Sequence, residues 1–319
     1  MRPVSPFWRV EPSQPRDWAA AFRLVFRSLP DRVQEERVAR ALDLVQRGEL
    51  DPSGLLVART GQGLLGAMLC QRLPGASGLV WPPQVLPNPA QRLVEDDLVV
   101  HATRYLGDGG TRLAQALLPV GVAFGGDSLT RNGFRQVTSL CWMRHDLRWG
   151  CSHLEGEEKL HWCRADDDLD LFAQTLEATY LQTLDCPELN GIRTISQVLE
   201  GHRAQARHDL SRWWLARYED EPVAVLLLAE SEDLEEWEVL YVGVVPQARR
   251  RGFGRELMKR ALGEARAAHA KALTLSVDTR NRPAWELYVQ LGFVPCDERI
   301  LLLAVWPAGA TGVGRGGRQ

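Results

Sequence analysis

The sequence predicts two similar α/β modules in tandem. The chain has 319 residues, which is long for one hydrophobic core and sufficient for two domains of about 150 residues each. Segments with strand-like and helix-like patterns follow one another in a similar order in the two halves. Three landmarks of the first half recur 159 residues later, namely Val85 and Val244, Leu118 and Val277, and Gly133 and Gly292. This constant separation indicates an internal duplication.

The first module, expected at residues 1–146, begins with a short strand and two amphipathic helices. Apolar residues at helical spacing define the helices, and Gly48 ends the second one. Asn88 and Pro89 are typical of a helix N-cap and a first helical position, so a third helix is expected from there towards Leu106. The strands are expected at residues 7–10, 55–59, 64–72, 79–85, 113–118 and 139–144, and the first two helices at residues 18–28 and 33–47.

The first half also contains the spelling of the dinucleotide-binding fingerprint GxGxxG, in Gly61-Gln62-Gly63-Leu64-Leu65-Gly66. In such a site the glycines open a helix, and an acidic residue follows about 20 positions later. Here a strand pattern follows directly, and Leu86 stands at the acidic position. We therefore interpret the segment as the turn of a β-hairpin.

The second module is expected at residues 160–306, after a polar linker at residues 147–159. A strand, two helices and a hairpin lead to the apolar strand VLYVGVV, which a loop, a helix, a strand, a helix and a last strand follow. In chain order these elements are expected at residues 160–164, 169–182, 194–208, 212–218, 223–229, 239–245, 255–268, 272–277, 283–290 and 300–306. The glycine-rich tail at residues 307–319 is expected to be disordered.

The composition is that of a soluble globular protein, with 45% hydrophobic and 25% charged residues. A formal net charge of −3 gives no overall attraction to nucleic acid. No apolar run approaches the roughly 20 residues that span a bilayer, and the N-terminus lacks a secretory signal pattern, so a cytoplasmic protein is expected. Metal-ligating side chains stand at Cys151, His153, His161 and Cys163, but their spacing fits no zinc pattern, and no metal is expected.

The most informative segment is the arginine- and glycine-rich loop between the strand VLYVGVV and the next helix. It contains Arg249, Arg250, Arg251, Gly252, Phe253 and Gly254. Unpaired backbone N–H groups and the helix dipole make a helix N-terminus a site for anions, and glycines let a phosphate approach the backbone. The loop therefore predicts a pyrophosphate site, with arginine side chains neutralising the phosphates and backbone amides from Arg250 to Arg255 binding their oxygens.

Two motifs in this half resemble those of the GNAT N-acetyltransferases. The loop resembles the acyl-CoA pyrophosphate loop of that family, and a later segment matches its pattern N-x-x-A-x-x-L-Y-x-x-L-G-F at Asn281, Ala284, Leu287, Tyr288, Leu291, Gly292 and Phe293. The resemblance covers residues 160–306. It implies a mixed, mostly antiparallel central sheet flanked by helices in each module. It also implies transfer of an acetyl group from acetyl-CoA to a primary amine.

The resemblance further implies roles for individual residues. Acetyl-CoA contacts are implied for Val242, Gly243, Val244, Arg249, Arg250, Arg251, Gly252, Phe253, Gly254, Arg255 and Asn281. The peptide-like pantetheine arm would lie along the strand, and Asn281 is also placed to cap the helix that follows it. Tyr288 is implied as the general acid for the departing CoA thiolate, because a phenol pKa of about 10 exceeds a thiol pKa of about 8.5. Core packing is the alternative interpretation of Tyr288.

Glu238 opens the central strand at the position of the catalytic glutamate in the histone acetyltransferases of this family. We expect its side chain to share a strand face with Leu240, Val242 and Val244 and to act as general base, with Glu236 as the fallback.

The first module lacks the corresponding groups. The loop maps onto Ala90–Glu95, which has no glycine and places a carboxylate at the helix start. Tyr288, Asn281 and Glu238 map onto Leu129, Val122 and Leu79. The first module is therefore expected to be a scaffold that does not bind acyl-CoA.

The acceptor is expected to be an amine-bearing small molecule or peptide. It should bind between Leu181–Arg193 and the chain after Phe293, where Asp185 and Glu188 would attract a cation. Two alternatives remain. Tandem modules with a degenerate first half resemble mycothiol synthases, which acetylate a cysteinyl sugar conjugate. A non-catalytic acyl-CoA sensor or interaction module would keep the loop but need neither Tyr288 nor Glu238.

Overall fold

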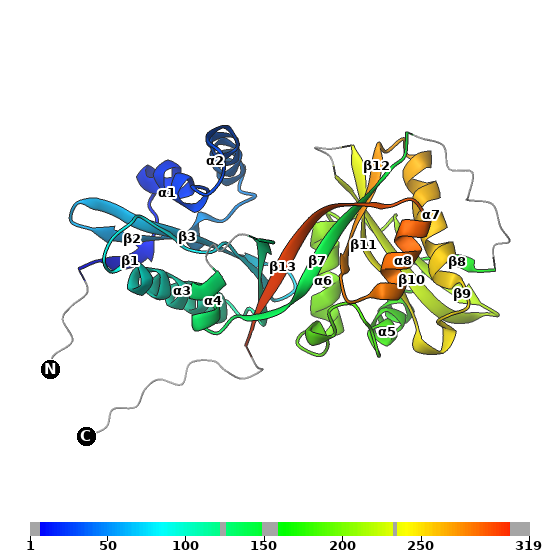
Figure 1. The fold of residues 1–319 in the computed structure, drawn as a ribbon. Coiled ribbons are helices and arrows are strands. Elements are labelled where there is room, and N and C mark those ends of the chain that lie inside the picture. The colour runs from blue at the N-terminus through cyan, green and yellow to red at the C-terminus, as the bar shows by residue number, and fades with distance from the viewer. Residues whose placement is uncertain (1–6, 122–125, 149–158, 232–234, 307–319) are drawn as a thin grey trace, which may run out of the picture. The chain divides into compact units, whose positions relative to one another are not determined.

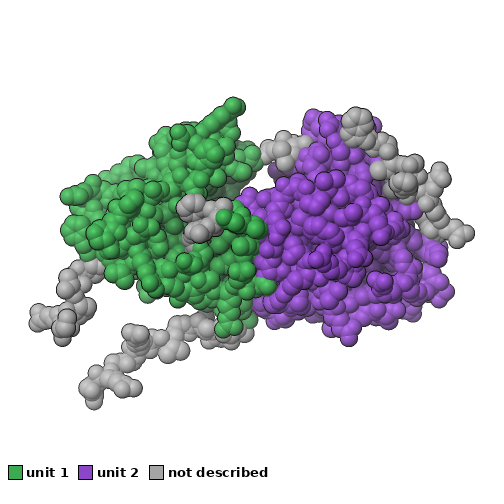
Figure 2. Space-filling view, viewed as in Figure 1, with its two compact units in different colours: residues 1–137, 300–319 green, residues 138–299 purple. Residues whose placement is uncertain are grey.

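The computed structural model describes residues 7–121, 126–148, 159–231 and 235–306. The chain divides into two compact units, unit 1 of residues 1–137 with 300–319 and unit 2 of residues 138–299 (Figure 2). The boundaries between them lie inside two strands, β7 (Arg135–Asp146) and β13 (Val294–Val305). No helix in the described ranges has both the length and the apolar character needed to cross a membrane.

Unit 1 is a mixed sheet with two pairs of helices (Figure 1). Its elements are β1 (Arg9–Pro12), α1 (Trp18–Val25), α2 (Asp31–Gln46), β2 (Leu55–Thr60), β3 (Gly63–Leu73), β4 (Ser77–Val80), β5 (Gln84–Val85), α3 (Gln91–Asp108), β6 (Leu113–Pro119) and α4 (Gly126–Arg131). The strand order is β1-β2-β3-β4-β6-β13. Alternate residues of β2 serve opposite faces: Leu55 and Val57 pack with α1 and α2, whereas Leu56 and Ala58 pack with α3.

Unit 2 repeats this plan. Its elements are β8 (His161–Arg164), α5 (Leu169–Thr179), α6 (Ile195–Gln205), β9 (Trp213–Tyr218), β10 (Glu221–Ser231), β11 (Glu236–Val244), α7 (Phe253–Ala267), β12 (Ala272–Asp278) and α8 (Arg282–Gln290). The strand order is β7-β12-β11-β10-β9-β8, and only β11 and β12 run parallel among its paired strands. The expected mixed, mostly antiparallel sheet is confirmed.

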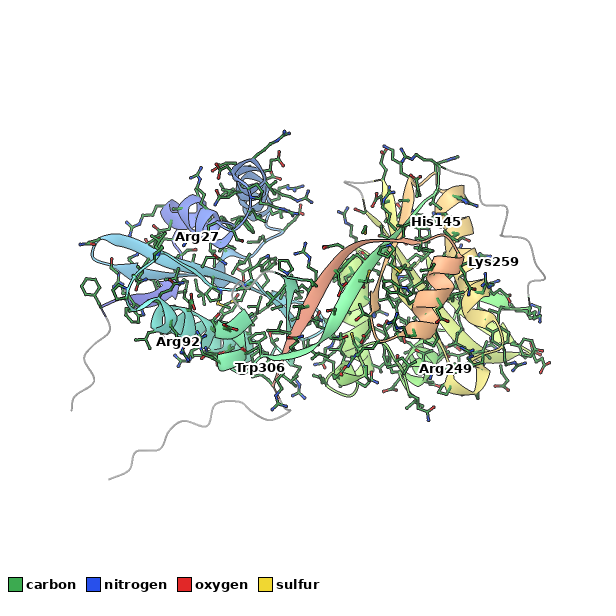
Figure 3. The ribbon with its side chains drawn as sticks, in the orientation of Figure 1. Arg27, Arg92, His145, Arg249, Lys259 and Trp306 are labelled. Atoms are coloured by element: carbon green, nitrogen blue, oxygen red, sulfur yellow. The ribbon has the colours of Figure 1, made fainter. Side chains whose placement is uncertain are left out.

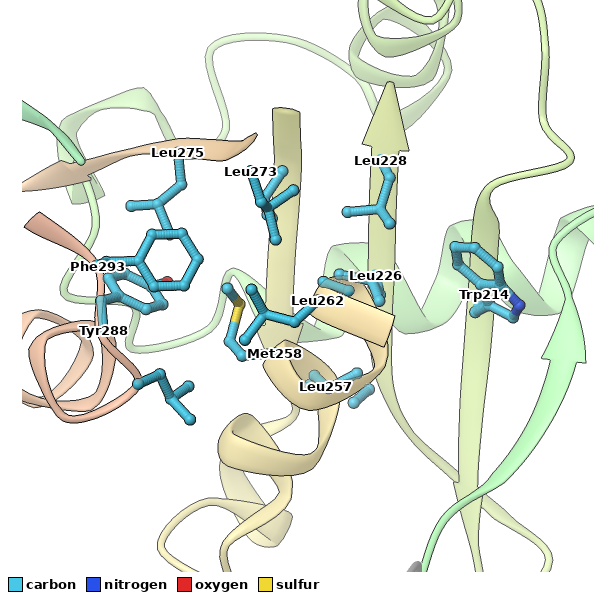
Figure 4. Packing of buried hydrophobic residues seen from close by; sticks show 14 of the residues in the cluster. Trp214, Leu226, Leu228, Leu257, Met258, Leu262, Leu273, Leu275, Tyr288 and Phe293 are labelled. Carbon is cyan, nitrogen blue, oxygen red and sulfur yellow. The ribbon is translucent and has the colours of Figure 1, made fainter. Parts of the chain in front are cut away.

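The core of unit 2 explains why α7 takes its place on the sheet. Leu257, Met258 and Leu262 recur at helical spacing and pack on Leu226 and Leu228 of β10 (Figure 4). Each fully buried side chain of this kind contributes about 1.5–3 kcal/mol. On the opposite face, α5 and α6 cover a second cluster that includes Phe172 and Trp213.

The internal duplication is confirmed in the register of the sheet. In unit 1, Ser77 of β4 pairs with Leu113 of β6, and in unit 2 Glu236 of β11 pairs with Ala272 of β12. Both members of the first pair lie 159 residues before their counterparts. The first residues of β7 and β13 are also 159 positions apart, and so are their last residues. The two parallel pairs are thus equivalent in position as well as in type.

The last strand of each half joins the unit of the other half. All seven residues of β12 pair with β7, from Ala272 with Asp146 to Asp278 with Leu140. The second part of β13 supplies Leu302 and Ala304 to the core of unit 1. The expected modules, residues 1–146 and 160–306, therefore correspond to the two repeats along the sequence. The compact units of the structure have other boundaries, which lie inside β7 and β13. Most of the expected linker and the whole expected tail lie outside the described residues.

Several local expectations for unit 1 were wrong in detail. The strand expected at residues 79–85 is divided into β4 and β5, because Pro82 and Pro83 interrupt it. Helix α3 begins at Gln91, and Asn88 precedes the cap by two residues, where its Oδ1 accepts a hydrogen bond from Ala90 N at 2.8 Å. Helix α4 was not expected. The hairpin turn at Gly61 is confirmed, since β2 and β3 pair antiparallel on either side of it.

Candidate active site

Strands β11 and β12 separate part of the way along their length. The pairing runs only from Glu236 to Val239 of β11, whereas β10 stays paired with β11 as far as Val244. Within the described chain, residues 241–244 of β11 therefore have a strand partner on one side only. Apart from Val244 O, which accepts a hydrogen bond from Arg249 Nε, the backbone groups on the other side form an open edge to which an extended, peptide-like ligand can bind.

A β-bulge lies where the two strands begin to separate. The register of β10 and β11 shifts between Leu227 and Leu228, so that Leu240 has no cross-strand partner. The bulge reverses which residues face α7. Before it, Trp237 and Val239 pack on the α7 side, and after it Val242 and Val244 do so, because one extra residue has been inserted.

The side chain of Glu238 lies on the face covered by α5 and α6. Its cross-strand neighbour is Ala229, which belongs to the core under those helices. The expectation that Glu238 shares a face with Val242 and Val244 was therefore wrong, because the bulge intervenes. The expected shared face with Leu240 is consistent with the packing of Leu240 in the same core.

Glu238 also differs from Glu236 in its environment. Glu238 is an exposed residue, but desolvation by neighbouring protein atoms raises the pKa of its carboxyl group. No hydrogen bond or ion pair involves the Glu238 carboxyl group within the described residues. In contrast, Glu236 Oε1 accepts hydrogen bonds from Arg144 Nε at 3.0 Å and Nη2 at 2.9 Å. The fallback carboxylate is thus already paired with a cation.

The loop before α7 presents an unpaired row of backbone amides. Arg250 and Gly252 have positive φ values of 64° and 90°, and α7 begins at Phe253 with no side-chain cap. Among the described residues, the amides of residues 250–254 have no acceptor, whereas Arg255 N donates to Gly252 O at 3.0 Å. Five N–H groups at the positive end of a helix form an anion site. The positive φ at position 252 favours glycine there.

The side chains of the three loop arginines make different contacts. Arg249, labelled in Figure 3, donates to Val244 O at 3.0 Å, Gln182 O and Thr179 O at 2.9 Å, and Leu181 O at 2.7 Å. Its guanidinium therefore joins the ends of β11 and α5, and it has little capacity left for a phosphate. The guanidinium of Arg251 stacks on Tyr218 at 4.4 Å. Arg250 is exposed and makes no ion pair within the described ranges, so it is best placed to meet a phosphate.

Tyr288 is buried on α8, with its ring 5.9 Å from that of Phe293 (Figure 4). Its hydroxyl has no hydrogen-bond partner in the described part of the chain. Burial raises the pKa of Tyr288, and the charges of Asp185 and Tyr241 raise it further. The phenol therefore stays protonated at neutral pH, as a proton donor must. Asn281 caps α8, with Oδ1 accepting from Ala284 N at 3.4 Å.

The residues of unit 1 that correspond to Gly254 and Arg255 are Glu95 and Asp96, which lie in the second turn of α3. Arg131 Nη2 lies 2.8 Å from Asp96 Oδ1 and 3.6 Å from Glu95 Oε2. Asp96 and Arg131 stand 159 residues before Arg255 and Gln290, whose side chains also form a hydrogen bond. The contact between the two helices is thus retained. The expectation of a carboxylate at the start of this helix was wrong, because α3 begins at Gln91 and its first turn contains no acidic residue. Unit 1 differs from unit 2 here in having no glycine at residues 90–95.

Sequence patterns alone did not identify two further residues of this region. The Tyr241 hydroxyl lies 2.7 Å from Thr179 Oγ1, next to the bulge, and Asp278 is a fully buried carboxylate at the end of β12. The sequence could have indicated Asp278, because this charged residue directly follows the apolar run ALTLSV.

Comparison with known proteins agrees with this geometry. Residues 178–293 match the model of the acetyltransferase (GNAT) family. The chain carries a GNAT-family domain. No curated protein matches it. The matched segment runs from the end of α5 to Phe293 and so contains the loop, the bulge and Tyr288.

Solved structures extend the GNAT likeness to the whole chain at the level of the fold. A GCN5-related N-acetyltransferase from Sphaerobacter thermophilus matches with a TM-score of 0.63 and 18% identity over 95% of this chain and 96% of that one. A tandem GNAT protein from the clavulanic acid biosynthesis pathway matches with a TM-score of 0.53 and 16% identity over 96% and 100%. A region of a fungal multi-domain GH3 β-N-acetylglucosaminidase, described as a GCN5-related glucosamine N-acetyltransferase region, matches with a TM-score of 0.59 and 15% identity over 94% of this chain and 38% of that one. The chain therefore has a tandem GNAT fold.

Proposed function

We propose that this protein transfers an acetyl group from acetyl-CoA to a primary amine, and that unit 2 carries the reaction. The observation that best supports the proposal is the row of five backbone amides without an acceptor at residues 250–254, in the loop before α7 and its first two residues, together with the open edge of β11. The amides and Arg250 would hold the pyrophosphate, and residues 242–244 would pair with the pantetheine arm. Unit 1 offers no such loop, so one acyl-CoA per chain is expected.

In the proposed reaction the neutral amine attacks the thioester carbonyl carbon. A carbon–nitrogen bond forms, the carbon–sulfur bond breaks, and the thiolate takes a proton from the Tyr288 hydroxyl. Glu238 takes the proton that the amine loses, directly or through a water molecule. The acid lies in the core under α7 and α8, whereas the base lies on the face covered by α5 and α6. The gap between β11 and β12 would let both reach a thioester bound at the open edge.

A screen for CoA release tests the proposal. The protein is incubated with acetyl-CoA and a panel of amines, amino sugars and peptides, and mass spectrometry identifies the acetylated product. The fungal glucosamine N-acetyltransferase region shares this fold, which justifies including amino sugars in the panel. We expect CoA and an acetylated amine in equal amounts. Binding of acetyl-CoA without release of CoA across the whole panel would support the sensor alternative instead, and acetylation of a cysteinyl sugar conjugate alone would indicate a mycothiol-synthase-like enzyme.

Glu238→Gln is expected to lower kcat/KM by about 10²-fold or more, because it removes the general base. The wild-type rate should fall as the pH is lowered through the pKa of Glu238, at a higher pH than for an ordinary glutamate, since burial raises this pKa. The variant should lack this acidic limb. Glu236→Gln, which removes only the partner of Arg144, is the matched control and should keep the limb. An unchanged pH profile in Glu238→Gln would exclude Glu238 as the base.

A further inference from the structure

An ionic network with a buried carboxylate at its centre and an exposed arginine–glutamate pair at its edge joins the segment between α5 and α6 to the turn before α8. Its centre is the carboxylate of Asp278, which is 0% exposed. Asp278 accepts hydrogen bonds from Thr138 Oγ1 at 2.7 Å, from Cys186 N at 3.1 Å, and from Arg280 N, Nε and Nη2 at 2.9, 3.1 and 2.7 Å. Burial alone would raise the pKa of Asp278, but the hydrogen bonds from Arg280 and Thr138 outweigh it and lower the pKa to about 2.

Arg280 extends the network to the other segment. Its Nη1 and Nη2 donate to Glu188 Oε1 at 2.7 Å and Oε2 at 2.8 Å, in the two-pronged geometry that makes arginine–carboxylate pairs strong and directional. Asp278 N also donates to Asp185 Oδ1 at 2.9 Å. Residues 185–188 are thus held at three points: Asp185, Cys186 and Glu188.

Apolar packing does not hold this segment in the same way. Leu181 and Leu184 are 62% and 53% exposed, so they contribute little burial. Gln182 and Cys186 have left-handed backbone conformations, with φ of 54° and 44°, which cost free energy for residues other than glycine. A strained surface segment keeps one conformation only if other contacts determine it. Here Arg249 holds the carbonyls of Leu181 and Gln182, and the ionic network holds residues 185–188.

Arg280 has the position in this network that a metal ion would need. Ligand atoms of Asp185, Cys186 and Asp278 lie within 4.8 Å of one another, which is close enough for a shared cation. However, Arg280 and Thr138 already donate to both carboxylate oxygens of Asp278. The guanidinium supplies the positive charge that a metal ion would bring.

We propose that Arg280 is a positioning residue that fixes the acceptor-side segment, residues 181–193, relative to Tyr288. The inference rests on the proposed function and on the expectation from the sequence that the acceptor binds beside this segment. Arg280 lies two residues before α8 begins at Arg282, and α8 carries Tyr288. The guanidinium therefore ties the segment beside the acceptor to the turn directly before the helix that carries the general acid. The charge of Asp185 acts on the Tyr288 hydroxyl, which is consistent with the segment lying near the reacting atoms.

Two substitutions test the proposal in the full chain. Glu188→Gln breaks the pair on the segment side and leaves Arg280 bound to Asp278, so it should fold even if Arg280→Gln, which strips a buried carboxylate of its cation, does not. Both variants should raise the KM for the acceptor roughly tenfold or more, since small displacements of a bound reactant are costly. The kcat and the acetyl-CoA Kd should change little. The double variant should be no worse than Arg280→Gln alone, because both act through one contact.

Amide hydrogen exchange provides the readout that does not depend on turnover. The amides of residues 181–194 should exchange faster in both variants than in the wild-type protein. Their exchange should be unchanged in the control Arg282→Gln, which removes the same charge from an exposed side chain two positions away. Unchanged exchange in folded Glu188→Gln, or a loss confined to kcat, would overturn the positioning role. If the wild-type protein acetylates no amine, the proposed function fails, and the exchange measurement still decides whether the network holds the segment.

Discussion

Tyr288→Phe is expected to lower kcat by about 10²–10³-fold while leaving the Kd for acetyl-CoA nearly unchanged. General acid catalysis contributes about 10²–10⁴-fold, and removal of one hydroxyl takes away the proton donor without emptying the core. Phenylalanine keeps the ring that packs on Phe293. The Tyr288 hydroxyl also has no hydrogen-bond partner in the described residues, so the variant leaves no buried group unpaired.

The measurement combines steady-state kinetics with a direct acetyl-CoA titration of the same preparation. Tyr105→Phe is the matched control, since it removes a hydroxyl that hydrogen-bonds Asp51 at 3.2 Å in unit 1. We expect the control to retain full activity. Full turnover by Tyr288→Phe would show that the tyrosine is core packing and that the thiolate leaves without this acid.

The second large expected effect is the loss of cooperative folding when β7 is removed from unit 2. A fragment of residues 147–306 is expected not to fold cooperatively, although it contains the whole expected second module. It would leave all seven residues of β12 without their β7 partner and would remove Cys141 and Met143 from the core. Each fully buried side chain is worth about 1.5–3 kcal/mol, a large share of a total stability of about 5–15 kcal/mol. It would also remove Thr138 from the Asp278 carboxylate.

A fragment of residues 135–299 is the appropriate comparison, because it keeps β7 and the part of β13 that belongs to unit 2. We expect it to unfold in one cooperative thermal transition and to bind acetyl-CoA. Near-ultraviolet circular dichroism and calorimetry distinguish the two fragments. Equal cooperativity and equal acetyl-CoA affinity in the 147–306 fragment would contradict the assignment of β7 to unit 2.

Sequence patterns predicted two α/β modules in tandem and the loop, and the resemblance to the GNAT family added the type of sheet. Hydrophobic periodicity and turn residues indicated most helices and strands, and the separation of 159 is present in the strand register itself. The loop at residues 249–254 was recognisable because its chemistry is local: a helix start, positive φ at Gly252, and adjacent charge. Such features depend on neighbours in the sequence, so the sequence carries them directly.

The exchange of β7 and β13 was not predictable in this way. Both strands have the alternation of a half-buried strand, and that pattern does not specify which sheet provides the partner. The bulge at Leu240 was also missed, because VLYVGV has no glycine or proline at the bulged position, and the register shift depends on β10. As a result Glu238 was expected on the wrong face relative to Val242.

The roles of charged residues depended even more on tertiary contacts. The three loop arginines look equivalent in the sequence, yet the guanidinium of Arg249 is taken up by four carbonyl oxygens, and Arg251 stacks on an aromatic ring. Glu188 was expected to attract the acceptor, but Arg280 neutralises it. The other carboxylate of residues 181–193, that of Asp185, has no ion-pair partner in the described chain. Burial raises the pKa of Asp185.

An acetyl-CoA titration by calorimetry tests the central claim most directly, namely that one acyl-CoA site exists per chain and is built on the loop before α7. The wild-type chain should bind one acetyl-CoA. Gly252→Val should weaken this binding about tenfold or more, because a branched residue is strained at a φ of 90°. Gly61→Val, at an open turn position without positive φ, should leave binding unchanged. Two equivalent sites in the wild-type chain, or one undiminished site in Gly252→Val, would contradict the account.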